Sequence, residues 1–186
     1  VASTVLTKIL RMRQILVCPK IIDPNLGIGT AIETTGEMIE ELPDSHCMVF
    51  TPFTAAMPYI EAHLKRVLDD PQVFVHLQGG LEPEEVARRV KLVKAERGIA
   101  ICSVQYAESF SIETASYGFF PGCDWDPFAN YQAEDRMHRM TTKNAVNLYY
   151  MRYIDSATDD SMAEILDGKV MSVNKFLRDL KAHKIP

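Results

Sequence analysis

Two arginines and a glutamine are spaced to share one face of a helix in the segment NYQAEDRMHRM, residues 130–140. At about 100° per residue, Gln132, Arg136 and Arg139 fall at positions i, i+4 and i+7 and form one stripe. The neighbouring stripe is apolar and comprises Ala133, Met137 and Met140. The pattern predicts a helix that buries one side and presents an amide and two guanidinium groups beside it. Guanidinium groups placed in this way can neutralise charge on a transferring phosphoryl group.

The same spacing has a second interpretation. Acidic residues lie within one helical turn of the last arginine, so Glu134 or Asp135 could pair with Arg139 on a solvated polar face. Helical geometry alone does not choose between a phosphate-binding stripe and a solvated one, and the choice depends on the rest of the chain.

Length and composition predict one globular domain. The 186 residues, 47% hydrophobic and 24% charged, are enough for a hydrophobic core and unlike a disordered chain. No apolar run reaches the ~18 residues of a membrane span, so no membrane association is expected. A net charge of -5 argues against a broadly basic nucleic-acid-binding surface but permits a local basic cleft. The start, VASTVLTKILRMRQ, lacks the order of a secretory signal and looks like the middle of a longer chain.

The four cysteines predict no metal site. Cys18, Cys47, Cys102 and Cys123 form no CxxC pair and have no histidine at ligand spacing. We expect reduced, mostly buried thiols of an intracellular protein, and no zinc.

Strand and helix patterns alternate along the chain. Five short runs rich in β-branched and aromatic residues predict strands, at 46–51, 73–78, 99–103, 117–121 and 146–154. Helical patterns cover 29–42, 54–68, 83–94, 130–140 and 158–168. The fold class predicted is α/β, with a parallel sheet and helices on both of its faces. Ligands of such folds bind beyond the carboxyl ends of the strands, so the loops after Thr51, Gln78, Ser103 and Pro121 are the ones to watch.

The chain lacks the usual means of holding a nucleotide by itself. It has no GxxxxGK[ST] phosphate loop, and the nearest glycine-rich piece, LGIGT at 26–30, has neither the lysine nor a preceding strand. No acidic run follows a hydrophobic strand to hold Mg²⁺. No GxGxxG follows the first strand, which disfavours a Rossmann-type oxidoreductase.

Six segments, in order, carry a resemblance to a known family: LTKILRMRQILVCPKIID (6–23), MVFTPFTAAMPYIEAHL (48–64), HLQGGLEPEE (76–85), ICSVQYAESFSIETASYGFF (101–120), WDPFANYQAEDRMHRM (125–140) and YIDSATDDSMAEIL (153–166). They resemble, respectively, the lead-in helix, motif IV, the Gly-Ser turn segment, motif V, motif VI and the tail of the Swi/Snf-type helicase-like ATPases of superfamily two. The core QAEDRMHR is the most specific of these matches. The resemblance implies the C-terminal of two RecA-like lobes, without a phosphate loop of its own, from an ATP-driven translocase or helicase on double-stranded DNA.

The resemblance also assigns roles to residues on the nucleotide side. Arg136 and Arg139 take the positions of the motif VI arginines, which reach toward ATP and Mg²⁺ held mainly by an N-terminal RecA-like lobe. Arg139 takes the arginine-finger position, Gln132 would position water or a phosphate oxygen, and Glu108 keeps the acidic position facing the cleft. The isolated chain is therefore expected to be folded but catalytically silent.

Four further residues are assigned to the DNA backbone by the same resemblance. Thr51 and Ser103 take the positions of hydroxyl residues in motifs IV and V, and Gly79 and Gly80 would allow close approach of the nucleic acid. The glycines usual in motif V are absent, with Tyr106, Ala107 and Ser109 in their places. These replacements favour an alternative function, in which a degenerate helicase-like lobe acts as a protein-interaction or scaffold module without ATPase activity.

Two more features keep alternative interpretations. Trp125, the only tryptophan, could pack under the loop after Pro121 or contact DNA. The basic runs at 63–66 and 87–97 could be solvated helix faces or could contact phosphate.

The resemblance suggests three divisions: a lead-in helix and linker at 1–27, a RecA-like lobe at 28–168 and a C-terminal helix at 169–186. The missing insertions of the family suggest a compact bacterial or phage member. The expected location is cytoplasmic, associated with the nucleoid in bacteria or phage, and nuclear in a eukaryote.

Overall fold

Five runs of β-branched, aromatic and small residues form a single parallel sheet in the computed structural model of the chain. The strands are β1 (His46–Thr51), β2 (Val73–Leu77), β3 (Gly98–Ser103), β4 (Ala115–Phe120) and β5 (Asn147–Tyr150). The structure describes residues 2–42, 46–68, 72–96, 98–110, 112–137, 145–154 and 164; the side chains at 2–6 and 107–109 are outside this description. The strands lie in the order β2-β3-β1-β4-β5, and every pairing is parallel.

The central strand, β1, is almost completely buried because it has a neighbour on each side and helices over both faces. Its alternate residues belong to two separate hydrophobic clusters: Met48 and Phe50 face one way, and Cys47 and Val49 face the other. This explains why the strand sequences show little polar alternation. It also means that each face of the sheet has its own helical layer.

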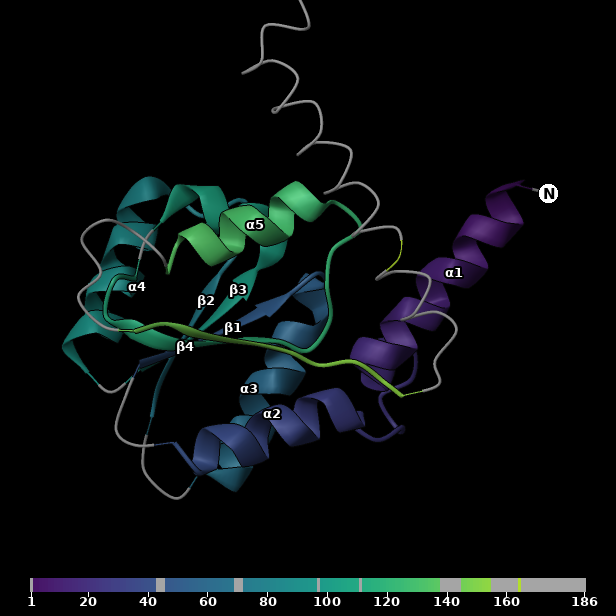
Figure 1. The fold of residues 1–186 in the computed structure, drawn as a ribbon, viewed down its shortest axis with the longest axis horizontal. Coiled ribbons are helices and arrows are strands. Elements are labelled where there is room, and N and C mark those ends of the chain that lie inside the picture. The colour runs from purple at the N-terminus through teal and green to yellow at the C-terminus, as the bar shows by residue number, and fades with distance from the viewer. Residues whose placement is uncertain are drawn as a thin grey trace, which may run out of the picture.

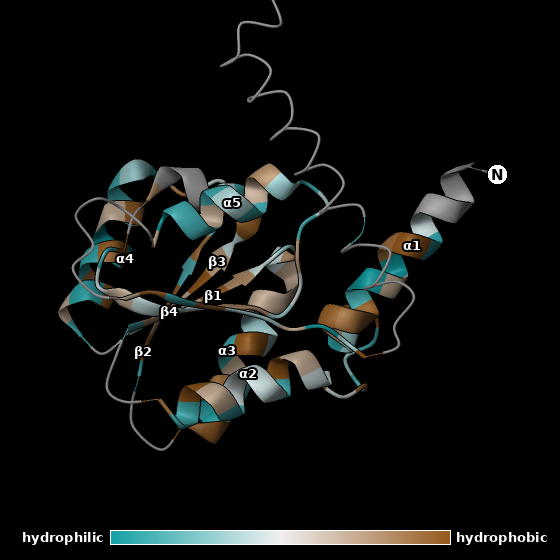
Figure 2. Cartoon of the chain, viewed as in Figure 1, coloured by the Kyte–Doolittle hydropathy of each residue, from teal (hydrophilic) through white to brown (hydrophobic). Residues whose placement is uncertain are grey.

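The helices of the two layers are α2 (Thr30–Glu40) and α3 (Met57–Val67) on one face, and α4 (Pro83–Ala95) and α5 (Pro127–Asp135) on the other. Figure 1 shows these two layers on opposite sides of the sheet. Three short 3-10 helices, η1 (Pro19–Ile21), η2 (Thr54–Ala56) and η3 (Val104–Ser109), occupy connections between the described elements. Figure 2 shows β1 and β3 in hydrophobic colours and hydrophilic colour over much of α4, as expected for a buried sheet under an amphipathic helix.

The first helix, α1 (Ala2–Val17), lies at one end of the molecule, and its N-terminal turns extend away from the sheet (Figure 1). Its C-terminal turn meets the body of the protein. Val17 is buried there and lies so close to Gly122 that a Cβ added to the glycine would overlap the Val17 side chain. The absence of a side chain at Gly122 therefore lets α1 dock on the loop after β4.

The predicted fold class is confirmed: the chain forms a parallel α/β sheet covered on both faces. All five predicted strands are present, although β5 ends at Tyr150 rather than at residue 154. Within the described residues, no helix is long and apolar enough to cross a membrane. The predicted helices at 158–168 and 169–186 fall outside the described residues, and the three proposed divisions of the chain stay predictions.

Candidate nucleotide and nucleic-acid interface

The helix that carries the glutamine and the arginines begins earlier than the sequence pattern predicts. α5 starts at Pro127 instead of Asn130, because Asp126 caps it: the Asp126 side chain accepts a hydrogen bond from the backbone N–H of Phe128 at 3.0 Å. Proline in the first turn has no N–H to leave unsatisfied. The Asp-Pro pair was thus the signal for this helix start.

α5 also ends before the predicted position. Its last helical residue is Asp135, and the N–H groups of Arg136 and Met137 donate to Ala133 and Glu134, three residues back, at 3.3 and 2.9 Å. This tightening turns the chain by more than 100° per residue and shifts Arg136 relative to an ideal α-helical stripe. Arg139 and Met140 lie outside the described residues, so the i+7 member of the stripe stays a prediction.

The predicted division of α5 into a buried and a polar side is confirmed for its described residues. Ala133 and Met137 are completely buried in the hydrophobic cluster of this face. Gln132 and Arg136 are partly exposed. Met137 lies against Gly118 of β4, where a Cβ would be 2.6 Å from its sulfur. The helix is therefore seated on the sheet by its apolar side, with Gln132 and Arg136 partly exposed and the Arg136 Nε atom itself buried.

The segment after β3 packs directly against α5. It forms η3, and Gln105 in this segment donates to the carboxylate of Asp124 at 3.2 Å, just before α5 begins. Tyr106, which replaces a family glycine, packs against the hydrophobic cluster and lies 6.4 Å from the Phe110 ring. Glu108 is in η3, but its side chain is not among those described. The elements expected to hold motifs V and VI are thus neighbours in space.

The two hydroxyl residues assigned to DNA end adjacent strands and are paired in register. Thr51 and Ser103 are partners across β1 and β3, and both side chains are buried. The Thr51 hydroxyl accepts a hydrogen bond from the N–H of Phe53 at 3.2 Å and thereby shapes the turn after β1. In this geometry Thr51 positions the turn, and a direct contact of its hydroxyl with phosphate stays a prediction.

Gly79 and Gly80 form an exposed turn after β2. Gly80 has a φ of 85°, which a residue with a side chain rarely adopts, and nothing lies within 4 Å of a Cβ placed on it. A Cβ on Gly79 would come to 3.8 Å from Tyr106, so this turn lies next to η3. The carboxyl ends of β1, β2 and β3 therefore gather the four residues assigned to DNA at one edge of the sheet.

The loop between β4 and α5 is held by a compact set of hydrogen bonds around Asp124, which is buried. Its backbone N–H donates to the Asn130 side-chain oxygen at 2.9 Å, and the Asn130 amide donates back to the Asp124 carbonyl at 2.9 Å. The Asp124 carboxylate also accepts from the N–H of Asp126 at 3.0 Å. These bonds fix the point at which α5 leaves the sheet.

A buried arginine of α1 completes this loop and was missed by sequence reasoning. Arg13 is 7% exposed and donates to the Cys123 carbonyl at 2.7 Å. Its guanidinium carbon lies 4.9 Å from the ring centre of Trp125 and 5.5 Å from that of Phe53. The sole tryptophan is partly exposed and packs against a cation of the same lobe, which favours the packing interpretation of Trp125.

Glu134 of α5 is bound from the other side by Tyr150 of β5, whose hydroxyl donates to the carboxylate. Burial and this neighbouring carboxylate both raise the pKa of the Tyr150 hydroxyl above its ordinary value. Glu134 thus fastens α5 to the edge strand β5. Its predicted pairing with Arg139 stays a prediction, because Arg139 lies outside the described residues.

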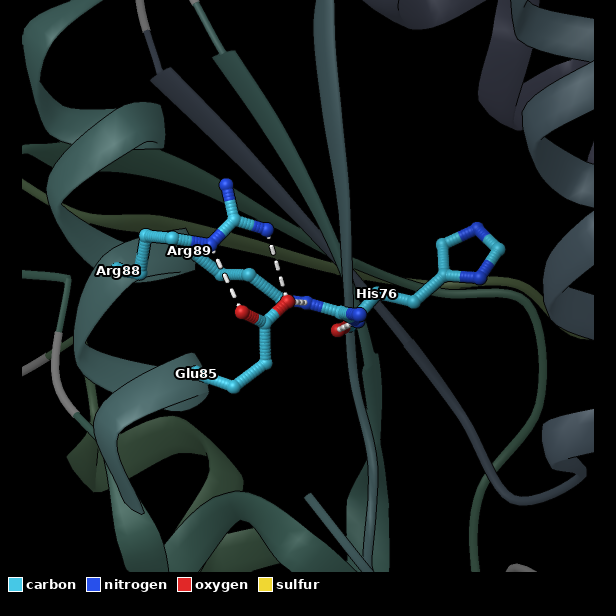
Figure 3. A network of polar contacts seen from close by, with 4 residues as sticks. All are labelled: His76, Glu85, Arg88 and Arg89. Carbon is cyan, nitrogen blue, oxygen red and sulfur yellow. Dashed lines mark hydrogen bonds and ion pairs between the residues drawn. The ribbon is translucent and has the colours of Figure 1, made fainter. Parts of the chain in front are cut away.

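Two arginines of the basic run on α4 pair with one carboxylate of the same helix. Glu85 accepts bonds from Arg88 at 2.7 and 2.8 Å and from Arg89 at 2.6 Å, as Figure 3 shows. Hydrogen bonds from Arg88 and then Arg89 lower the pKa of the Glu85 carboxyl to about 2. Arg89 also donates to the backbone carbonyl of His76 at 2.6 Å. A surface groove of about 280 Å³ lies beside this network, between α3 and α4.

No metal site is formed by the described residues: they contain no group of three or more His, Cys, Asp or Glu side chains that could hold an ion. Cys18, Cys47 and Cys102 are buried and Cys123 is partly exposed, in agreement with the expected buried thiols. Burial raises the pKa of the Cys102 thiol well above its usual value, so this cysteine remains a neutral core residue.

Comparison with known proteins identifies relatives by sequence over most of this chain. The mouse DNA annealing helicase and endonuclease ZRANB3 is 28% identical over 161 residues, which is 82% of this chain and 15% of that protein. The TATA-binding protein-associated factor BTAF1 of Arabidopsis thaliana is 26% identical over 81% of this chain and 7% of its own length. The transcription regulatory protein SNF2 of Saccharomyces cerevisiae is 25% identical over 69% of this chain and 8% of its own. The chain thus spans less than a sixth of these relatives.

A solved structure supports the fold. The C-terminal part of the Fun30 ATPase domain superposes with a TM-score of 0.68 at 17% identity, covering 74% of this chain and 45% of that one. No sequence profile of a known protein family matches the chain. The relatives reported are eukaryotic, so they lend no support to the expected bacterial or phage origin.

Proposed function

We propose that the chain is a C-terminal RecA-like lobe of the Swi/Snf helicase-like ATPases, and that it completes the ATP site of a DNA translocase whose nucleotide is held mainly by an N-terminal lobe. In this proposal Arg136 and Arg139 reach across the interlobe cleft to the phosphates. Gln132 orients water or a phosphate oxygen, and Glu108 faces the cleft from η3. ATP and Mg²⁺ supply the phosphoryl group and its charge compensation when bound; this chain supplies positive charge and alignment.

The arrangement of α5 is the observation that carries the proposal. Its apolar side, with Ala133 and Met137, is fully buried, so the helix has one fixed orientation on the sheet. That orientation leaves Gln132 and Arg136 partly exposed, on a helix packed against η3. A guanidinium held on a rigid element can stabilise transition-state charge without first being ordered.

The edge of the sheet formed by the ends of β1, β2 and β3 is the proposed DNA side. The exposed turn at Gly79 and Gly80 would admit a phosphate backbone closely, because neither residue has a side chain. Thr51 and Ser103 shape the adjoining turns from buried positions. If the parent protein is eukaryotic, like the relatives, its working location is the nucleus.

A second candidate function follows from Tyr106. This residue packs against the hydrophobic cluster, partly buried, at a position where the resembled family has glycine, and so replaces a flexible residue of η3 with a packed side chain. A lobe with such a segment could serve as a protein-interaction or scaffold module without ATPase activity. ATP hydrolysis separates the two candidates.

The test uses a protein in which this chain is joined to its proposed N-terminal lobe. We expect DNA-stimulated ATP hydrolysis that falls about 10³-fold or more in Arg139→Ala and by about 10²-fold or more in Arg136→Ala, as for removal of transition-state charge. Arg11→Ala is the matched control, because Arg11 is exposed on α1 and its described partner is Gln14 of the same helix. Equal turnover in all four proteins, or none in the unaltered one, would favour the scaffold.

A further inference from the structure

Arg13 is an unusual core residue because it is a cation in the buried interface between α1 and the loop after β4. Moving a guanidinium out of water is costly unless hydrogen bonds and opposite charge compensate. Burial lowers the pKa of Arg13, while Asp124 and Cys123 act in the opposite direction. A guanidinium nevertheless stays protonated, so the chain has placed a permanent positive charge here.

The contacts of Arg13 all lie on the segment that introduces α5 or on the turn after β1. Cys123 accepts its hydrogen bond, and the Trp125 and Phe53 rings flank its guanidinium. A plain apolar residue would fill such a site more cheaply, as buried ion pairs are often replaced by hydrophobic residues without loss of stability. The Arg13 side chain therefore orients the segments that it contacts, in addition to filling space.

Hydrogen bonds lead from this cation to both motif-bearing elements. Asp124, the charged neighbour of Arg13, is linked to Asn130 within α5 and to Gln105 at the start of η3. Asp126, two residues further, caps α5. The position of α5, and with it Gln132 and Arg136, is thus connected to α1 through a short series of direct contacts.

We propose that Arg13 is a positioning residue, which sets the start of α5 and the adjoining η3 according to how the lead-in helix α1 is docked. The inference rests on the proposed function of α5. Arg13 does not touch nucleotide; it acts through the loop at 121–126. Undocking α1 therefore misplaces the guanidinium of Arg136 and slows the chemical step more than it weakens ATP binding.

The first experiment uses the 186-residue chain, in which Trp125 is the only tryptophan and reports directly on its neighbour. Arg13→Met keeps an unbranched side chain as far as the position of Nε and removes the cation. We expect a red-shifted Trp125 emission spectrum, partial recovery in Arg13→Lys, and no change in Arg11→Met. A spectrum of Arg13→Met that coincides with the unaltered one would overturn the inference.

The second experiment measures ATP hydrolysis by the chain joined to its proposed N-terminal lobe. We expect kcat to fall about 10- to 100-fold in Arg13→Met with KM for ATP changed less than about threefold, because small misplacements of a catalytic group have effects of this size. Gly122→Ala disturbs the docking of α1 at Val17 without altering Arg13, and should reproduce the loss of kcat. Gly122→Ala also tests the inference if Arg13→Met fails to fold.

The results of these experiments distinguish a failure of the proposed function from a failure of the proposed role of Arg13. If Arg136→Ala abolishes turnover but Arg13→Met and Gly122→Ala leave it unchanged, the proposed function stands and the role of Arg13 is wrong. If Arg136→Ala and Arg139→Ala both turn over like the unaltered protein, the proposed function fails and this inference fails with it. Loss of kcat in Arg13→Met and Gly122→Ala but not in Arg11→Met supports both.

Discussion

A single methyl group added at Gly118 should disturb the seat of α5. Gly118 lies in β4 beneath the end of the helix, and a Cβ placed on it would be 2.6 Å from the Met137 sulfur and 2.8 Å from Leu148 Cδ2. Contacts this short do not occur between real carbon atoms and their neighbours. Gly118→Ala must therefore push Met137 or Leu148 aside.

The size of the effect follows from two opposing contributions. Overpacking a well-filled core costs about 1–3 kcal/mol. Replacing glycine reduces the freedom of the unfolded chain and returns about 0.4–1 kcal/mol. We expect a net loss of about 1–2 kcal/mol in the free energy of unfolding, which lowers Tm by about 2–8 °C in a domain of this size.

A double-mutant cycle identifies Met137 as the group that is displaced. Met137→Ala alone should cost about 2–5 kcal/mol, because it leaves a cavity at a completely buried position. In the double variant the new methyl group enters that cavity. The two losses should therefore sum to at least about 1 kcal/mol less than additivity predicts.

Urea unfolding of the 186-residue chain, followed by circular dichroism and Trp125 fluorescence, measures each term. The matched control is Gly27→Ala, where nothing lies within 4 Å of the new methyl group and the change should stay within about 0.5 kcal/mol. If the Gly118 and Met137 losses are additive within about 0.5 kcal/mol, the helix is not seated as described.

Three further predictions concern other parts of the lobe. Burial, and then Arg66, lowers the pKa of His63 below the value of about 6.5 expected in the unfolded chain. The free energy of unfolding should therefore fall as pH drops below about 6.5 and level off below the folded pKa. His63→Gln should flatten this slope in urea titrations at several pH values. Gly80→Ala should cost about 1–2 kcal/mol despite open space around it, since φ is 85°, and an unchanged urea midpoint would contradict the strain argument. Thiol labelling of the native chain should modify Cys123 rapidly and Cys102 only after unfolding; mass spectrometry of labelled peptides checks the order.

The sheet could be predicted from sequence because its strands are short, apolar and covered on both faces. In β1 and β3 nearly every side chain is buried, so an unbroken apolar run was the correct signal. The apolar side of α5 was predicted for a similar reason: Ala133 and Met137 are four residues apart and both are buried, although Met137 lies in the tightened turn just after the regular helix. Local periodicity was sufficient wherever the contacts it reflects are repetitive.

Other features depend on contacts between distant residues and left no periodic signal. Arg13 meets Cys123, 110 residues later, and nothing in the basic segment at 11–13 distinguishes it from the exposed Arg11. Thr51 was assigned to phosphate on the basis of resemblance, whereas the structure shows its hydroxyl bound within the turn. Only the start of α5 had a local signal, the Asp-Pro pair at 126–127, that sequence reasoning passed over.

The hydrogen bond between Arg89 and the His76 carbonyl bears on edge-to-edge strand pairing between two copies of the lobe. β2 is the outermost strand on its side of the sheet, and an outermost strand invites hydrogen bonding by a foreign chain. The Arg89 side chain already occupies one of the acceptors that a foreign strand would need. Glu85 holds the same arginine in place, so an incoming strand would have to break both contacts. A foreign strand at this border of the sheet would therefore compete with Arg89 for the His76 carbonyl, and sequence alone had assigned Arg89 only to a basic surface.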